Sequence, residues 1–131
     1  GGATFRVKDG PGGQRDIELL AQAGALIAGA AERRAPEQLE AAASAGWLDP
    51  DDAASLKDAH ALFSIVNQCG RLLTDGDLDV EDVGAGGRAF LAEKAGAPDD
   101  ETLGQWLDAA RGQAVKIVDA KLPPPEETKD A

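Results

Sequence analysis

The stretch DPDDAASLKDAHALFSIVNQCGRLL, residues 49–73, carries the strongest helical signal in this chain. Asp49 offers an N-cap, Pro50 suits the first helical position, and the acidic pair that follows favours the positive end of a helix dipole. Apolar or small residues then recur in alternating steps of three and four, namely Leu56, Ala59, Phe63, Val66, Gly70 and Leu73. This spacing predicts one long helix that buries a single face.

Helical patterns also lie on both sides of this stretch. Upstream, one pattern begins at Asp16 and fades at residues 32–34, and Pro36 then opens an alanine-rich helix that Gly46 can end. Downstream, we expect a short helix from Arg88 to Ala95 and a longer one after residues 98–100. The first pattern is carried by Ile17, Leu20, Gly24, Ile27 and Ala31, and the last by Leu103, Leu107, Ala110, Ala114 and Ile117.

Five helices with short connections predict an all-α fold, an antiparallel bundle that we assign to residues 15–122. Aromatic residues make up only 4% of the chain, so the core must be built mainly from Ala, Leu, Val and Ile. The glycine-rich residues 1–14 are expected to form an extended arm. The proline-rich residues 123–131 are expected to form a disordered tail, because their composition offers too little apolar surface to bury.

The charge of the chain restricts its partners. It has 131 residues, of which 13 are basic and 24 acidic, and its net charge of −11 opposes binding to a nucleic-acid backbone. No apolar run approaches the roughly 20 residues that cross a bilayer, and no signal peptide opens the chain. We therefore expect a soluble, cytoplasmic protein that binds neither nucleic acid nor membrane. The absence of methionine, even at position 1, indicates a fragment or a processed chain.

Patterns typical of metal binding or catalysis are weak. The segment TDGDLDVEDV, residues 74–83, places three aspartates at alternate positions, as an EF-hand loop does. That loop needs a glycine at its sixth position and a glutamate at its twelfth, where Val80 and Gly86 stand, so an acidic connection between helices is the better interpretation. His60 has no second His or cysteine cluster near it in the sequence and is interpreted as a boundary residue. We predict no metal site and no self-contained catalytic site.

The stretch KDGPGGQRDIELLAQ, residues 8–22, sets two glycines directly before the first helical pattern. Gly12 and Gly13 allow a sharp turn or a close backbone approach, and Asp16 then lies in the first helical turn, where its charge is favourable. Three polar residues share one helical face because they are separated by three and four positions: Arg15, Glu18 and Gln22. From these residues alone, the solvent-exposed face of an ordinary helix is the simpler interpretation.

The same stretch resembles a known signature. VKDGPGGQRDIELLAQ is similar to the Gly-Gly-x-x-Asp/Glu-Ile-Glu-Phe-x-x-Gln motif of bifunctional glutamine synthetase adenylyltransferase/adenylyl-removing enzymes, which PII uridylyltransferases share more loosely. Gln14 stands where the family usually has an aliphatic residue, and Leu19 where it usually has Phe. Residues 39–73 and 88–122 also resemble helices of the family, so the likeness covers residues 7–122. The matching motif residues are Gly12, Gly13, Asp16, Ile17, Glu18 and Gln22.

The resemblance implies a helical domain that follows a nucleotidyltransferase domain, most similar to the C-terminal, adenylyl-transferring half of the family. In the family, the preceding domain binds ATP and magnesium and transfers AMP to a tyrosine of glutamine synthetase, which regulates nitrogen metabolism. This chain lacks the Gly-Ser loop and the Asp-x-Asp pair of that domain. We therefore expect it to be catalytically incomplete, to bind no cofactor itself, and to act in regulation or substrate docking.

The resemblance also implies where this domain meets its neighbours. Residues 1–14 are then the junction to the missing nucleotidyltransferase domain, which is the expected partner, and glutamine synthetase and the PII protein are further candidates. Glu18 is expected to lie nearest the active site. The alternative function is a stand-alone acidic helical domain that binds a basic protein without enzymatic context. The motif residues expected to serve the junction are Lys8, Gly12, Gly13, Arg15, Asp16, Glu18 and Gln22.

Overall fold

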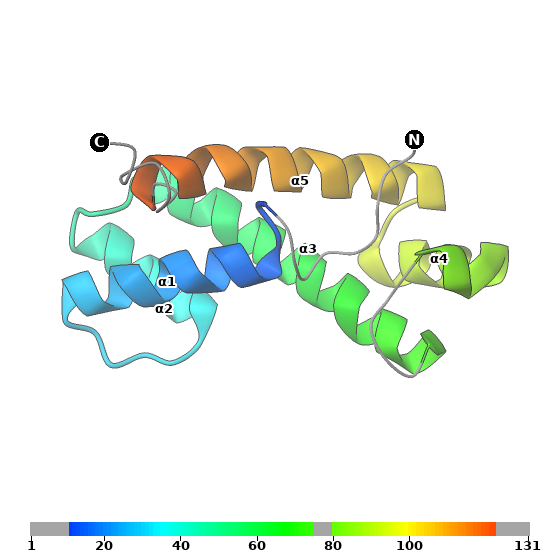
Figure 1. Cartoon of the computed structure of the whole chain (residues 1–131), viewed down its shortest axis with the longest axis horizontal. Coiled ribbons are helices and arrows are strands. Elements are labelled where there is room, and N and C mark those ends of the chain that lie inside the picture. The colour runs from blue at the N-terminus through cyan, green and yellow to red at the C-terminus, as the bar shows by residue number, and fades with distance from the viewer. Residues whose placement is uncertain (1–10, 75–79, 123–131) are drawn as a thin grey trace, which may run out of the picture.

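The computed structural model describes residues 11–74 and 80–122, and within these ranges the chain forms five packed α-helices and no β-strand (Figure 1). This confirms the prediction of an all-α fold with five helices. The expected tail and most of the expected arm lie outside the described residues. The helices are α1 (Gln14–Ala28), α2 (Ala35–Ser44), α3 (Pro50–Thr74), α4 (Val80–Ala95) and α5 (Asp100–Lys121).

Three helices begin where their sequences predict. Pro36 lies in the first turn of α2. At the start of α3, the Asp51 N–H donates to Asp49 Oδ2 at 3.0 Å, and at the start of α5, the Thr102 N–H donates to Asp99 Oδ1 at 2.7 Å. Because the first N–H groups of a helix have no acceptor within the helix, these two carboxylates fix the starting points of α3 and α5.

Helix α1 ends earlier than its apolar pattern predicts. Gly29 adopts a left-handed conformation (φ 69°), and the Ala30 N–H donates to the Ala25 carbonyl at 2.9 Å, as in a glycine C-cap. The predicted continuation to residues 32–34 is therefore wrong, and Ile27, a member of the pattern, is 57% exposed. The buried face of α1 consists of Ile17, Leu20, Ala21, Gly24 and Ala25.

Helix α4 begins earlier than predicted, at Val80 instead of Arg88. It is interrupted at Gly84, whose backbone is not helical (φ 69°, ψ −179°), so two helical pieces meet at a kink. The predicted helix corresponds to the second piece. Glycines at positions 84, 86 and 87 lower the helix propensity of this region, which explains why the pattern gave no signal for the first piece.

The longest helices, α3 and α5, run in opposite directions along most of the molecule (Figure 1). Helices α1 and α2 pack at one end of this pair, and α4 packs at the other. Helices α1 and α2 approach closely, because a Cβ added to Gly24 would lie 2.6 Å from the Ala42 Cβ. The largest fully buried side chains are Phe63, Ile17, Leu20, Leu39, Leu48, Leu56, Leu91, Leu103, Leu107 and Val66.

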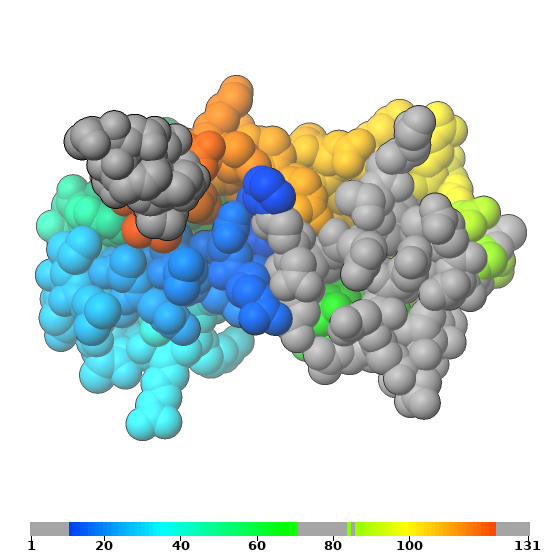
Figure 2. All heavy atoms as spheres, viewed as in Figure 1, coloured from blue at the N-terminus to red at the C-terminus, as the bar shows by residue number. Residues whose placement is uncertain are grey.

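Helix α1 lies at the surface of the molecule, and its atoms are visible on the face shown in Figure 2. The segment at residues 29–34 then leads back along α1 (Figure 1), so that Pro36 and Gln22 line the same cavity. Among the described helices, none combines the length and apolar character that a bilayer crossing requires.

Candidate functional site

The start of α1 is built by the predicted turn at Gly12 and Gly13. Gly12 adopts a left-handed conformation (φ 74°), and a Cβ there would overlap the Arg111 carbonyl oxygen and lie 2.6 Å from Val115 Cγ2. The Gly12 N–H donates to Asp16 Oδ2 at 3.0 Å, and Arg111 Nη1 donates to the Pro11 carbonyl at 3.1 Å. These contacts fix the chain to α5 immediately before α1 begins.

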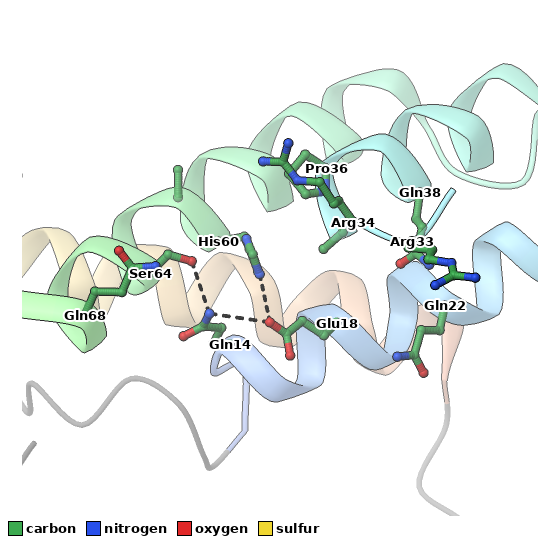
Figure 3. A pocket seen from close by; sticks show the side chains of 12 residues that line it. Gln14, Glu18, Gln22, Arg33, Arg34, Pro36, Gln38, His60, Ser64 and Gln68 are labelled. Atoms are coloured by element: carbon green, nitrogen blue, oxygen red, sulfur yellow. Dashed lines mark hydrogen bonds and ion pairs between the residues drawn. The ribbon is translucent and has the colours of Figure 1, made fainter. Parts of the chain in front are cut away.

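A polar cluster of four side chains joins α1 to α3, and it consists of Gln14, Glu18, His60 and Ser64 (Figure 3). The ring nitrogen His60 Nε2 lies 3.0 Å from Glu18 Oε2. The side-chain amide of Gln14 donates to Ser64 Oγ at 3.1 Å and, more weakly, to Glu18 Oε2 at 3.4 Å. The cluster thus holds the Glu18 carboxylate from two sides.

The spacing along both helices explains why these residues meet. Gln14 and Glu18 are four residues apart on α1, and His60 and Ser64 are four residues apart on α3, so each pair lies on one helical face. The side chain of His60 is 14% exposed and that of Glu18 is 44% exposed. Glu18 is therefore held at the edge of the bundle, where a group outside the bundle can still reach it.

The polar cluster borders a cavity of about 600 Å³ between α1, α2 and α3. Its walls carry charges of both signs, with Glu18 on α1 and the two arginines Arg33 and Arg34 before α2 (Figure 3). The cavity lining also contains the neutral side-chain amides of four glutamines and the hydroxyl group of Ser64. The cavity is lined by Gln14, Glu18, Gln22, Arg33, Arg34, Ala35, Pro36, Gln38, His60, Ala61, Ser64 and Gln68.

Six of the residues predicted from the motif lie in the described part of the chain, and they divide into three groups. Gly12, Gly13 and Asp16 form the turn that starts α1, and Glu18 and Gln22 line the cavity. Arg15 is exposed and is not part of the cavity lining. Lys8 lies outside the described residues.

Three members of the cluster were not identified by the sequence motif. From the sequence, His60 is interpreted as a boundary residue and Gln14 as a departure from the family pattern, and no pattern assigns a role to Ser64. The structure brings all three to Glu18 or to one another. The available signal was the spacing of His60 and Ser64, which places two polar groups on one side of a helix that otherwise has an apolar stripe.

Within residues 11–74 and 80–122, no group of three or more His, Cys, Asp or Glu side chains is arranged to hold a metal ion. The aspartates at positions 75, 77 and 79, which suggested and then failed to match a calcium loop, lie outside the described residues. Among the described residues, Glu18 is the only carboxylate that lines the cavity, and it is paired with His60. A hard cation such as Mg²⁺ prefers several oxygen ligands, so the cavity lining does not fit such an ion.

Comparison with known proteins identifies the relatives of this chain. Residues 3–117 match the family described as GlnD PII-uridylyltransferase. A bifunctional glutamine synthetase adenylyltransferase/adenylyl-removing enzyme of Stenotrophomonas maltophilia is 33% identical over 130 residues, which are 95% of this chain and 14% of that protein. An enzyme of the same description from Xanthobacter autotrophicus is 34% identical over 107 residues, which are 78% of this chain and 11% of that protein. No solved structure matches the chain.

The five-helix fold and this similarity define the class as a helical domain related to nitrogen-regulatory nucleotidyltransferases. Within the class, the chain belongs to the GlnD PII-uridylyltransferase family. The resemblance to glutamine synthetase adenylyltransferases is confirmed as distant homology over most of the chain. The assignment to the adenylyl-transferring half of such an enzyme stays a prediction.

Proposed function

We propose that this chain is the helical regulatory or substrate-docking domain of a glutamine synthetase adenylyltransferase, and that it acts beside a nucleotidyltransferase domain of the same polypeptide. The observation that carries the proposal is the placement of Glu18. This residue belongs to the family motif, is held by His60 and Gln14, and remains 44% exposed beside the cavity. A carboxylate held in this way is suited to contact a neighbouring domain.

The proposal divides the chemistry between two domains of a cytoplasmic enzyme. The nucleotidyltransferase domain binds ATP and Mg²⁺ and transfers AMP to a tyrosine of glutamine synthetase, and PII acts as a regulatory partner. Among the described residues, the cavity lining does not supply a Mg²⁺ ligand set, so the share of the cavity in this proposal is contact and not metal chemistry. Its share is to position the catalytic domain and its substrate.

Glu18 is a positioning residue in this proposal. Within the described part of the chain, both of its hydrogen bonds use Oε2, so Oε1 can accept a donor from a group outside the bundle. Such a charge-assisted bond is stronger than a bond between neutral groups and fixes relative orientation. His60 and Gln14 contribute by holding the carboxylate in one rotamer.

The test is adenylyl transfer to glutamine synthetase by the full-length polypeptide with Glu18→Ala. We expect the rate to fall by about tenfold or more, because small misplacements of reacting groups have large kinetic effects. Circular dichroism and the melting temperature check that the bundle stays folded. Glu40→Ala is the matched control, because Glu40 is an exposed acid on α2 that pairs with Lys57 and does not line the cavity. Unchanged transfer by Glu18→Ala refutes the role of Glu18.

A second experiment separates docking from support. The chain alone is titrated by calorimetry with glutamine synthetase, PII, glutamine and ATP after its helical fold has been verified. Binding to one of the two proteins supports an autonomous docking module. If the folded chain binds none of these molecules, and Glu18→Ala lowers adenylyl transfer by the full-length polypeptide, the function of the chain lies in its contacts with the catalytic domain. If Glu18→Ala also has no effect, the stand-alone acidic interaction domain becomes the better explanation.

A further inference from the structure

Helix α1 has a second face on which two leucines are largely exposed. Four residues follow one another in steps of four, three and four, and we call them the outer face of α1: Arg15, Leu19, Gln22 and Leu26. Leu19 is 58% exposed and Leu26 is 82% exposed. The outer face lies opposite the buried face that contains Ile17 and Gly24.

The two leucines contribute little to the core of this chain. A side chain that is 82% exposed removes little apolar surface from water, so Leu26 adds little to the free energy of unfolding. Gln22 lies between the two exposed leucines and Arg15 precedes them, so the outer face combines apolar and polar groups, as the surface of a domain interface does. Gln22 also lines the cavity, so the outer face adjoins the candidate site.

We infer that the outer face of α1 is the surface on which the nucleotidyltransferase domain of the same polypeptide docks. This inference rests on the proposed function. The relatives contain much additional chain, because the matched segment makes up only 14% and 11% of their length. A domain that could cover the outer face is therefore part of the same polypeptide.

The start of α1 restricts where a domain that precedes it in the chain can lie. Gly12 is held against α5, and Asp16 closes the turn, so the chain reaches α1 from a defined point. Leu19 lies seven residues after Gly12, which is about 10 Å along a helix. A domain joined to the chain before Gly12 can therefore cover Leu19 and then Leu26 without a long connection.

Charge argues against a second copy of this chain as the occupant. Each copy carries a net charge of −11, and two such copies repel each other when their surfaces meet. Burial of only two leucines on each copy would contribute little free energy to offset this repulsion. A covalently linked domain also has the advantage of a high effective concentration.

The test measures how fast a maleimide reagent labels single cysteines on α1. Leu19→Cys, Leu26→Cys and Ile27→Cys are each made in a Cys69→Ala background, because Cys69 is the only cysteine among these 131 residues, and labelling is quantified by mass spectrometry on the peptide that contains α1. Ile27 is the matched control, since it is also exposed, at 57%, but lies about 100° around the helix from Leu26. Each variant is labelled in this 131-residue chain and in the full-length polypeptide.

We expect Leu19→Cys and Leu26→Cys to react at least about tenfold more slowly in the full-length polypeptide, because a covered thiol reacts only when the contact opens. Ile27→Cys should react at similar rates in both. Equal labelling of Leu19→Cys and Leu26→Cys in the two contexts overturns the inference. Protection that appears in the chain alone and grows with its concentration also overturns it, in favour of a second copy. Adenylyl transfer by the same full-length polypeptide is measured separately, so loss of the proposed function and absence of docking give different results.

Discussion

Gly12 is the single residue on which the start of α1 depends most directly. Gly12→Ala would place a Cβ against the Arg111 carbonyl and 2.6 Å from Val115 Cγ2, and it would hold alanine at a φ of 74°. We expect the free energy of unfolding to fall by at least about 2 kcal/mol, because left-handed geometry alone costs a residue with a side chain about 1–2 kcal/mol. Urea denaturation followed by circular dichroism measures this loss.

Gly29→Ala provides the control for that substitution. Gly29 has a similar left-handed conformation (φ 69°), but a Cβ added there meets no atom within 4 Å. Only the conformational cost remains, so we expect a loss of about 1 kcal/mol. If the two variants lost the same stability, the contact between the turn and α5 would not contribute.

The pair formed by Glu18 and His60 makes a second prediction about individual residues. A double-mutant cycle with Glu18→Ala and His60→Ala should give a coupling energy of about 1 kcal/mol, because His60 is largely buried and the groups are in direct contact. The exposed pair of Arg34 and Glu37, 3.7 Å apart, should give a coupling energy close to zero. Similar coupling energies for both pairs would contradict the idea that α3 holds Glu18 in place.

Helix α5 depends on its cap. The side chain and the backbone N–H of Thr102 both form hydrogen bonds with the Asp99 carboxylate, and these bonds lower the pKa of Asp99. Because the pKa is lower in the folded state, the contribution of the charged cap is present at neutral pH. It is lost as the pH falls from the ordinary carboxyl value of about 3.9 through the lowered pKa. Asp99→Ala should therefore lower the melting temperature at pH 7, and its difference from wild type should shrink in acid.

Asp99→Asn distinguishes the cap from the charge. Asparagine keeps an oxygen that accepts the Thr102 N–H, so this variant should keep most of the melting temperature at pH 7. Its difference from the wild-type protein should also shrink in acid, because that difference reflects the ionised carboxylate. Melting curves at several pH values would contradict the cap assignment if Asp99→Asn were as unstable as Asp99→Ala at pH 7.

The contact between α1 and α2 requires a glycine for steric reasons. Gly24→Ala gains helix propensity of about 1 kcal/mol, but its Cβ would lie 2.6 Å from Ala42 Cβ and 3.1 Å from the Trp47 ring. We expect the overlap to win and the protein to become less stable. Gly112→Ala in α5 meets no atom within 4 Å and should stabilise the protein by about 0.5–1 kcal/mol. Urea denaturation compares the two, and stabilisation by Gly24→Ala would show that α1 and α2 are less closely packed.

Comparison of sequence and structure shows which elements local patterns can predict. Asp49 and Asp99 begin their helices because capping is a local interaction, and the stripe through Leu56 and Phe63 is buried as its spacing predicts. The kink at Gly84 was not predicted, since glycine-rich segments give little helical signal.

The candidate site was only partly predictable for a related reason. Glu18 was identified through the motif, but His60 comes from another helix, 42 positions away in the sequence. Which side chain of α3 faces Glu18 depends on how two helices pack, and spacing within one helix does not determine this. Gln14 likewise meets Ser64 only because α1 and α3 are in contact.

The two ends of the molecule should differ in local stability. Helices α1 and α2 pack together at one end of α3 and α5 (Figure 1), whereas α4 packs at the other end and is broken at Gly84. Among the described side chains of α4, only Leu91 and Ala92 belong to the buried core. A segment with few buried apolar contacts opens at a lower free energy than the rest of a domain. We therefore predict that α4 opens before the part that contains α1, α2 and α3.

Native-state hydrogen exchange at increasing urea measures this difference. Amides at residues 85–95 should exchange through an opening with weak urea dependence, whereas amides around Phe63 should exchange only through global unfolding. Leu91→Ala should accelerate exchange in α4 more than in α1. Since Leu26 lies near the end of α1 that is farthest from α4 (Figure 1), this variant should leave the labelling of Leu26→Cys unchanged. If amides in α4 and α3 exchanged with the same free energy, the five helices would instead unfold as one cooperative unit, and a disturbance at α4 would reach the Glu18 cluster.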